Sequence, residues 1–166
     1  MNLYEELIQE SFQLGLIVYE REFRSGARGL IDGNLIGIRR SLTSREKSGI
    51  LAEEIGHHYT GVGRSLSRSL NSRRQEVRAR QWGHIRIIPF SRFLDAHRAR
   101  ISGRYDLAAY LDVAEVFLQE AVDRYKDKHG LFVELDDEHT LCLDPLFVIE
   151  PYAHAYKEVV CSAKLE

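Results

Sequence analysis

The chain has 166 residues, of which 44% are hydrophobic and 29% charged, and its formal net charge is −2. This is the composition of an ordinary soluble globular protein with one domain, or one domain and a small appendage. No segment approaches the roughly 18 consecutive apolar residues of a membrane-spanning helix, and the acidic N-terminal stretch is unlike a signal peptide. Cys142 and Cys161 form neither a disulfide framework nor a metal-binding spacing, so we expect thiols in a reducing cytoplasm.

The first part of the chain predicts one helix followed by three strands. Apolar residues recur on one face of a helix over residues 2–14. Residues 16–20 are short and rich in β-branched and aromatic side chains, which predicts a buried strand. Residues 29–31 and 35–38 flank Asp32-Gly33-Asn34, and an Asp-Gly pair between apolar runs is typical of a hairpin turn. A three-stranded sheet is the simplest assembly of these pieces.

Two long helices are expected next. Thr43 with Glu46 three residues later is a capping box, which predicts a helix from 44 to 60. The Ser- and Arg-rich residues 64–71 are typical of a loop. A second helix is expected at 72–88, since a proline follows it.

The last third of the chain predicts short helices and a second hairpin. The expected elements are a helix at 91–98, two helices within 104–128 that bend at 111–113, a hairpin of 131–135 with 140–143, and a weakly patterned tail at 151–166. The spacing at 107–114 is similar to that of a helix-turn-helix. The second helix of this pair is rich in acids, however, which argues against direct DNA binding.

The stretch from Leu51 to Thr60 carries the chemistry that organises these elements. Glu53 and His57 are four residues apart, so on a helix they lie on one face and can converge on one metal ion. Glu54 is rotated by about 100° from Glu53, where it can touch a bound water without being a ligand. This is the logic of the H-E-x-x-H helix, with Glu53 in place of the first His. Gly56 leaves room for close packing or for substrate.

Each of these residues also has a plainer interpretation. A Glu-Glu-x-x-His pattern on a helix is usually a solvated, charged face. His58 is rotated by about 100° from His57, so both cannot easily join Glu53 at one metal. Glu76 is the only acid on its helix. It is either an ion-pair partner of Arg78 or Arg80 or a third metal ligand from a neighbouring helix.

Positive charge is concentrated in the middle of the chain. Residues 64–104 contain eleven Arg and no Lys, against Glu76 and Asp95 as the only acids. Such asymmetry indicates an acidic partner, nucleic acid, or internal pairing with acidic neighbours. We favour internal pairing of arginines on solvated helix faces.

Several blocks in a fixed order resemble the ImmA/IrrE family of metallopeptidases, in the form found in prophages and mobile elements of Gram-positive bacteria. The similarity runs from about residue 2 to 145. The matching blocks are Gly29-Leu30 and the strand through Ile38, Glu46 to Thr60 with Ala-Glu-Glu-Ile-Gly-His-His at its centre, Arg74 to Trp82, Ile88-Pro89-Phe90, and Tyr105 to Val113.

The resemblance implies an α+β, small zincin-like domain. It has a roughly three-stranded sheet, an active-site helix, a following ligand helix, and a C-terminal helical pair plus hairpin. We expect the metallopeptidase core at 1–100, the helix-turn-helix-like pair packed on it at 101–130, and the hairpin and tail at 131–166.

The resemblance also implies a metal-dependent endopeptidase. Carried over residue by residue, the general base is Glu54 and the metal ligands are Glu53, His57 and Glu76. The family's fuller pattern has His at position 53. A Glu-His-Glu set is harder and more anionic, so besides Zn²⁺ it tolerates other divalent ions such as Mn²⁺. The implied substrate and partner is a helix-turn-helix repressor of a phage or mobile element. Its inactivation in the cytoplasm would relieve repression of that element.

Two other interpretations stay open. In the first, the domain keeps the peptidase shape but controls a repressor by binding alone, and Glu53 is the feature that favours it. In the second, the Arg-rich region and the helical pair at 105–128 bind DNA.

Overall fold

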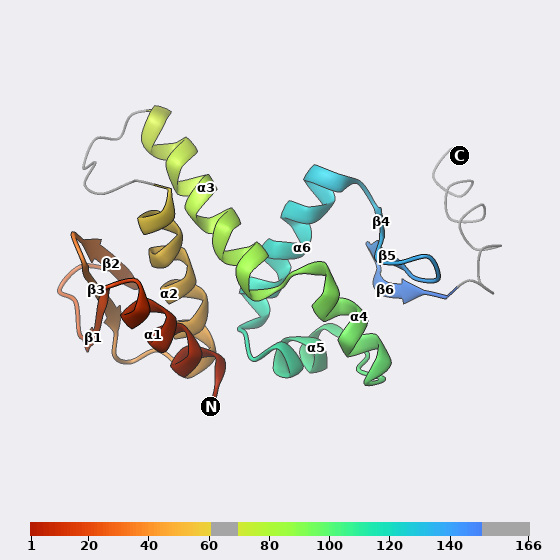
Figure 1. The fold of residues 1–166 in the computed structure, drawn as a ribbon, viewed down its shortest axis with the longest axis horizontal. Helices are drawn as coiled ribbons and strands as arrows, with labels where there is room; N and C mark the ends of the chain where they lie inside the picture. Colours follow the sequence, from red (N-terminus) through yellow and green to blue (C-terminus); the bar gives the residue numbers. More distant parts are fainter. Residues whose placement is uncertain (61–69, 151–166) are drawn as a thin grey trace.

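The computed structural model describes residues 1–60 and 70–150, without the side chains of 70–72. The described chain is α+β, as expected (Figure 1). Its helices are α1 (Leu3–Gln13), α2 (Ser44–Tyr59), α3 (Leu70–Ile87), α4 (Phe90–Arg98), α5 (Arg104–Leu111) and α6 (Glu115–His129). Its strands are β1 (Ile17–Arg21), β2 (Gly29–Asp32), β3 (Leu35–Arg39), β4 (Phe132–Glu134), β5 (Thr140–Leu143) and β6 (Leu146–Ile149).

The first sheet has the order β1-β3-β2, with α1 and α2 packed against it (Figure 1). The predicted hairpin of β2 and β3 is confirmed, and Gly33 supplies the positive φ of 64° that its turn requires. β1 joins β3 in parallel. The prediction that β1 is buried was wrong, since Ile17 is 55% exposed. β1 lies at an edge of the sheet, and the fully buried side chains belong to the central strand, at Ile36 and Ile38.

The helix that carries the motif begins where the sequence predicts. The Thr43 hydroxyl accepts a hydrogen bond from the Glu46 backbone N–H, and the Glu46 carboxylate accepts one from the Thr43 N–H. α3 follows and is a long helix from Leu70 to Ile87, two residues longer at its start than predicted. Pro89 is the N-cap of α4, so the chain turns directly from one helix into the next.

Small residues bring α2 and α3 unusually close together. A Cβ added at Gly56 would overlap the carbonyl oxygen of Ala79 in α3. One turn further along, a Cβ at Gly83 would lie 3.3 Å from the Ala52 backbone. Gly56 therefore serves close packing, one of its two expected roles, and this contact sets the distance between the side chains that α2 and α3 direct into the same cavity.

The C-terminal half adds helices α4, α5 and α6 and a second sheet, which lies at the opposite end of the molecule from the first (Figure 1). The helical pair α5–α6 is confirmed, and its bend is made by Asp112 in the left-handed conformation, at φ 57°. The expected hairpin is a three-stranded sheet of order β4-β5-β6, because Leu146–Ile149 adds a strand that the sequence reasoning left out. The predicted tail at 151–166 and most of the loop at 64–71 lie outside the described residues.

One hydrophobic cluster connects the two halves. It contains buried residues from Tyr4 in α1 to Leu143 in β5, including Leu51 and Ile55 of the motif helix. Within residues 1–60 and 70–150, no helix has both the length and the apolar character needed to cross a bilayer.

Candidate functional site

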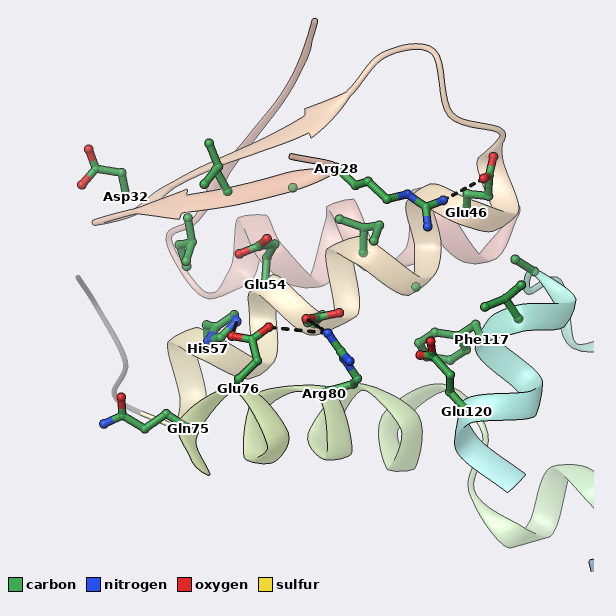
Figure 2. Close-up of a pocket in the computed structure, with 18 residues that line it drawn as sticks. Arg28, Asp32, Glu46, Glu54, His57, Gln75, Glu76, Arg80, Phe117 and Glu120 are labelled. Carbon is green, nitrogen blue, oxygen red and sulfur yellow. Dashed lines mark hydrogen bonds and ion pairs between the residues drawn. The ribbon is translucent and has the colours of Figure 1, made fainter. Parts of the chain in front are cut away.

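A cavity of about 1060 Å³ opens between β2 and α2 on one side and α3 and the start of α6 on the other. Figure 2 shows this groove with β2 above, α3 below and α2 between them. All the residues that the sequence predicts as catalytic or metal-ligating line it, namely Glu53, Glu54, His57 and Glu76. The groove is therefore the candidate site, and its residues come from segments far apart in the chain.

Three of these residues meet around one point. Glu53, His57 and Glu76 each place one potential ligand atom within 4.8 Å of the other two. The His57 Nε2 lies 3.4 Å from the Glu76 Oε2. Glu53 and His57 are one turn apart on α2, and Glu76 reaches them from α3 across the Gly56–Ala79 contact. The structure thus contains the triad that the sequence predicts, in an arrangement that could hold a metal ion.

Glu54 occupies a different environment from Glu53. It is only 8% exposed and lies beneath β2, where a Cβ at Gly29 would be 2.7 Å from its Oε1. A side chain at position 29 would overlap Ile50 and this carboxyl, so the glycine lets β2 pass close over α2. Burial, reinforced by the charges of Glu53 and Glu76, raises the pKa of Glu54 to about 8. This carboxyl is thus poised to hold a proton near neutral pH.

The triad itself also has perturbed proton affinities. Burial lowers the pKa of His57, an effect that the nearby Glu53 charge partly offsets. A neutral imidazole keeps a lone pair available for a metal. Burial, together with a hydrogen bond that the protonated Glu53 carboxyl donates to Glu76, raises the pKa of Glu53, and Arg80 opposes this shift. Glu53 and Glu76 repel each other when both are ionised in this half-buried site. A divalent cation between them would stabilise the ionised form of both carboxylates.

Arg80 belongs to the site, although the sequence reasoning treated it only as a partner for Glu76 on their own helix. That pair exists, with 3.6 Å between the Arg80 guanidinium and the Glu76 Oε1. The same guanidinium lies closer to Glu53, at 3.1 Å from its Oε1. Spacing could have identified Arg80, because residues 76 and 80 lie on one face of α3. The internal pairing that we favoured for the arginines is also seen between Arg86 and Glu10.

His58 takes no part in the triad. Its side chain is exposed, and its ring makes an edge contact with Tyr59, which stacks on Trp82 at 4.8 Å between ring centroids. Neither His58 nor Tyr59 lines the groove. The rotation of His58 away from His57 is as the helical geometry predicts.

The donor set fits a divalent metal ion. It consists of two carboxylates and one imidazole that is neutral at pH 7, all from regular helices. Carboxylate and imidazole donors suit Zn²⁺ and also Mn²⁺.

Comparisons with protein-family models, with curated proteins and with solved structures found no match for this chain.

Proposed function

We propose that the protein is a metal-dependent endopeptidase with a small zincin-like fold. The observation that carries this proposal is the convergence of Glu53, His57 and Glu76 beside a third carboxyl, that of Glu54, which is buried and not part of the triad. This combination separates the two tasks of such a site, since three residues can hold the ion and one can accept a proton.

Each residue has a definite role in this proposal. Glu53, His57 and Glu76 would hold Zn²⁺ or Mn²⁺, which when bound supplies Lewis acidity to water and to the scissile carbonyl. Glu54 accepts the proton that the attacking water loses and can pass it to the leaving amine. Without metal the pKa of Glu54 is raised to about 8, and a bound divalent cation would lower it, which favours the ionised carboxylate that can accept a proton at neutral pH.

The groove also has a place for a peptide backbone. β2 is an edge strand whose pairing partner is β3, and its residues from Gly29 to Asp32 line the groove directly above Glu54 (Figure 2). Leu30 is 51% exposed on this strand. An extended segment can pair with such an edge and present its carbonyl groups to the site. We propose a helix-turn-helix repressor as the protein that supplies this segment.

A second function is favoured by the position of Arg80. Its guanidinium already contacts two of the three triad residues, Glu53 and Glu76. A resident cation of this kind makes the carboxylates stable without metal. The competing proposal is therefore a zincin-like module that binds a repressor and cleaves nothing.

A single experiment distinguishes the peptidase from the binding module. Purified protein is incubated with Zn²⁺ or Mn²⁺ and a helix-turn-helix repressor from the same genome, and products are identified by mass spectrometry. The peptidase proposal predicts defined fragments with wild type, none with Glu54→Gln, and equal metal content in both proteins. Glu6→Gln, on the exposed face of α1, is the matched control. A stable complex with wild type and no fragments would replace the peptidase by the binding module.

A further inference from the structure

The groove extends beyond the metal triad to the start of α6, and this end of it has its own chemistry. Phe117 and Glu120 point into the groove from α6, across from the Arg28–Glu46 ion pair (Figure 2). The roles proposed for the triad and Glu54 use none of these α6 residues. They are therefore candidates for selecting what the groove binds.

The groove has an excess of negative charge. Its lining includes six carboxyl groups, those of Asp32, Glu46, Glu53, Glu54, Glu76 and Glu120. Among the described residues, the guanidinium groups that line it with them are two, Arg28 and Arg80. Arg28 pairs with Glu46 at 2.7 Å and Arg80 pairs with Glu53 at 3.1 Å. With a divalent ion bound at the triad, the net charge of the groove lining would still be negative or, at most, zero. A basic peptide segment is therefore the complementary occupant.

A buried histidine behind Glu120 lacks a hydrogen-bond partner. His84 of α3 is 3% exposed, and neither of its ring nitrogens has a hydrogen bond within the described part of the chain. Its Nε2 faces the Glu120 Oε2 at 3.9 Å, which is too long for a direct hydrogen bond. Burial lowers the pKa of His84 to about 4, so the ring is neutral and one nitrogen can accept a hydrogen bond.

Glu120 is the acceptor that a ligand in the groove can reach. Both ring nitrogens of His84 are enclosed, and His84 is not among the residues that line the groove. At 3.9 Å the histidine also provides no direct hydrogen bond to the Glu120 carboxylate. An ammonium or guanidinium group that enters the groove can supply N–H donors to this carboxylate.

The approach to Glu120 is apolar. The Phe117 ring packs on Gly49, where an added Cβ would lie 2.7 Å from the ring, and it makes an edge contact with His84 at 4.8 Å between centroids. Ile50 and Val116 complete this surface, and Val116 is 66% exposed. A long side chain with a methylene stem and a charged head matches an apolar wall that ends in a carboxylate.

We propose that the α6 end of the groove is a specificity subsite for a lysine or arginine side chain of an extended peptide. The stem lies on Phe117 and the cationic head binds the Glu120 carboxylate. This inference rests on the proposed function for its peptide substrate, and it identifies that substrate as a basic segment.

The test measures binding separately from cleavage. Two fluorescently labelled peptides share one sequence and differ at one central position, which is Lys or norleucine, so that only the ammonium group changes. Fluorescence anisotropy with the Glu54→Gln protein gives the affinity without turnover. We expect the Lys peptide to bind about tenfold more tightly than the norleucine peptide, the usual effect of one charge-assisted hydrogen bond.

Variants of the subsite locate the effect. Glu120→Gln should reduce the preference for Lys, while Glu120→Lys should reverse it in favour of a peptide with Glu at the same position. Glu115→Gln, on the same helix but outside the groove lining, should leave the preference unchanged. The reversal expected in Glu120→Lys is a gain of affinity for the Glu peptide, and a misfolded protein would not show such a gain. Equal affinities for Lys and norleucine, or no binding of either peptide, would overturn the proposal.

Cleavage of the same peptides by the wild-type protein with Zn²⁺ separates the two proposals. A Lys preference in binding without fragments keeps the subsite and removes the peptidase. Fragments formed equally from both peptides keep the peptidase and remove the subsite.

Discussion

The buried Glu54 carboxyl should make stability fall as pH rises, in the absence of metal. Its pKa in the folded protein, about 8, lies above the 4.5 of an ordinary glutamate. The folded state therefore holds the proton more tightly than the unfolded state does. The stabilisation is complete below pH 4.5 and is lost as the pH rises through 8. A paired surface carboxylate behaves in the opposite way, because its pKa is lowered by folding.

The size of the effect follows from the shift. Each pKa unit corresponds to about 1.4 kcal/mol, so the free energy of unfolding should change by at most about 5 kcal/mol. Groove water relieves part of the burial penalty. We therefore expect wild type to lose about 2 to 4 kcal/mol relative to Glu54→Gln between about pH 5 and pH 8.5. This would be a large share of the 5 to 15 kcal/mol that is typical of a domain, on the order of a third.

Urea unfolding in the presence of a chelator measures this difference. Wild type, Glu54→Gln and the exposed control Glu6→Gln are unfolded at several pH values, and the wild-type and control curves should coincide. Added Zn²⁺ should reduce the pH dependence of wild type, because a nearby cation favours the ionised carboxylate. Parallel pH profiles for wild type and Glu54→Gln would refute the reasoning, since they would mean that Glu54 is ionised in the folded protein at neutral pH.

Three further changes test the site and its frame. Gly56→Val should push α3 away at the Ala79 carbonyl, lowering the free energy of unfolding by about 2 to 3 kcal/mol and weakening Zn²⁺ binding in calorimetry; unchanged Zn²⁺ affinity would contradict this. His57→Ala should reduce the metal content, measured by elemental mass spectrometry, from about one equivalent to none. Full retention of the metal would show that His57 is not a ligand. Tyr125→Phe removes a buried hydrogen bond of 2.7 Å to the Ile88 carbonyl. It should cost about 1 to 2 kcal/mol in urea unfolding and leave metal content unchanged.

The helix that carries the site could be predicted because its signals are local. The capping box of Thr43 and Glu46 fixes its first turn, and helical spacing places Glu53 and His57 on one face. Glu76 was a weaker prediction, since the same residue could pair with an arginine on its own helix. It does both, lying 3.4 Å from His57 and 3.6 Å from Arg80.

The environment of Glu54 could not be predicted, because it depends on contacts between distant segments. The depth of the carboxyl is set by β2 passing over it at Gly29. The same limit applies to the sheets. Whether β1 is central or at an edge is decided by its parallel pairing with β3, which no local signal encodes. β6 was left out although Leu146–Ile149 has a strand-like composition and follows β5 after two residues, the length of a tight hairpin turn.

The subsite at α6 shows the same limit in the clearest form. Glu120 belongs to a helix that the sequence describes only as acidic and ill suited to DNA. Its position beside His84 depends on the packing of α6 against α3. Gly49, one turn before the motif, makes room for the Phe117 ring, and this role is visible only in the folded structure.

Glu53 and Arg80 are best understood together. A glutamate in place of the first histidine of an H-E-x-x-H helix adds a negative charge to a site that already contains Glu54 and Glu76. The Arg80 guanidinium, 3.1 Å from Glu53, returns the pair to the neutral charge of an imidazole while leaving a carboxylate oxygen for a metal. A histidine at position 53 alone would remove the anion between the guanidinium and a divalent ion, and the two cations would then repel each other at close range. The effect of Glu53 on metal binding therefore depends on Arg80, which reaches it from α3.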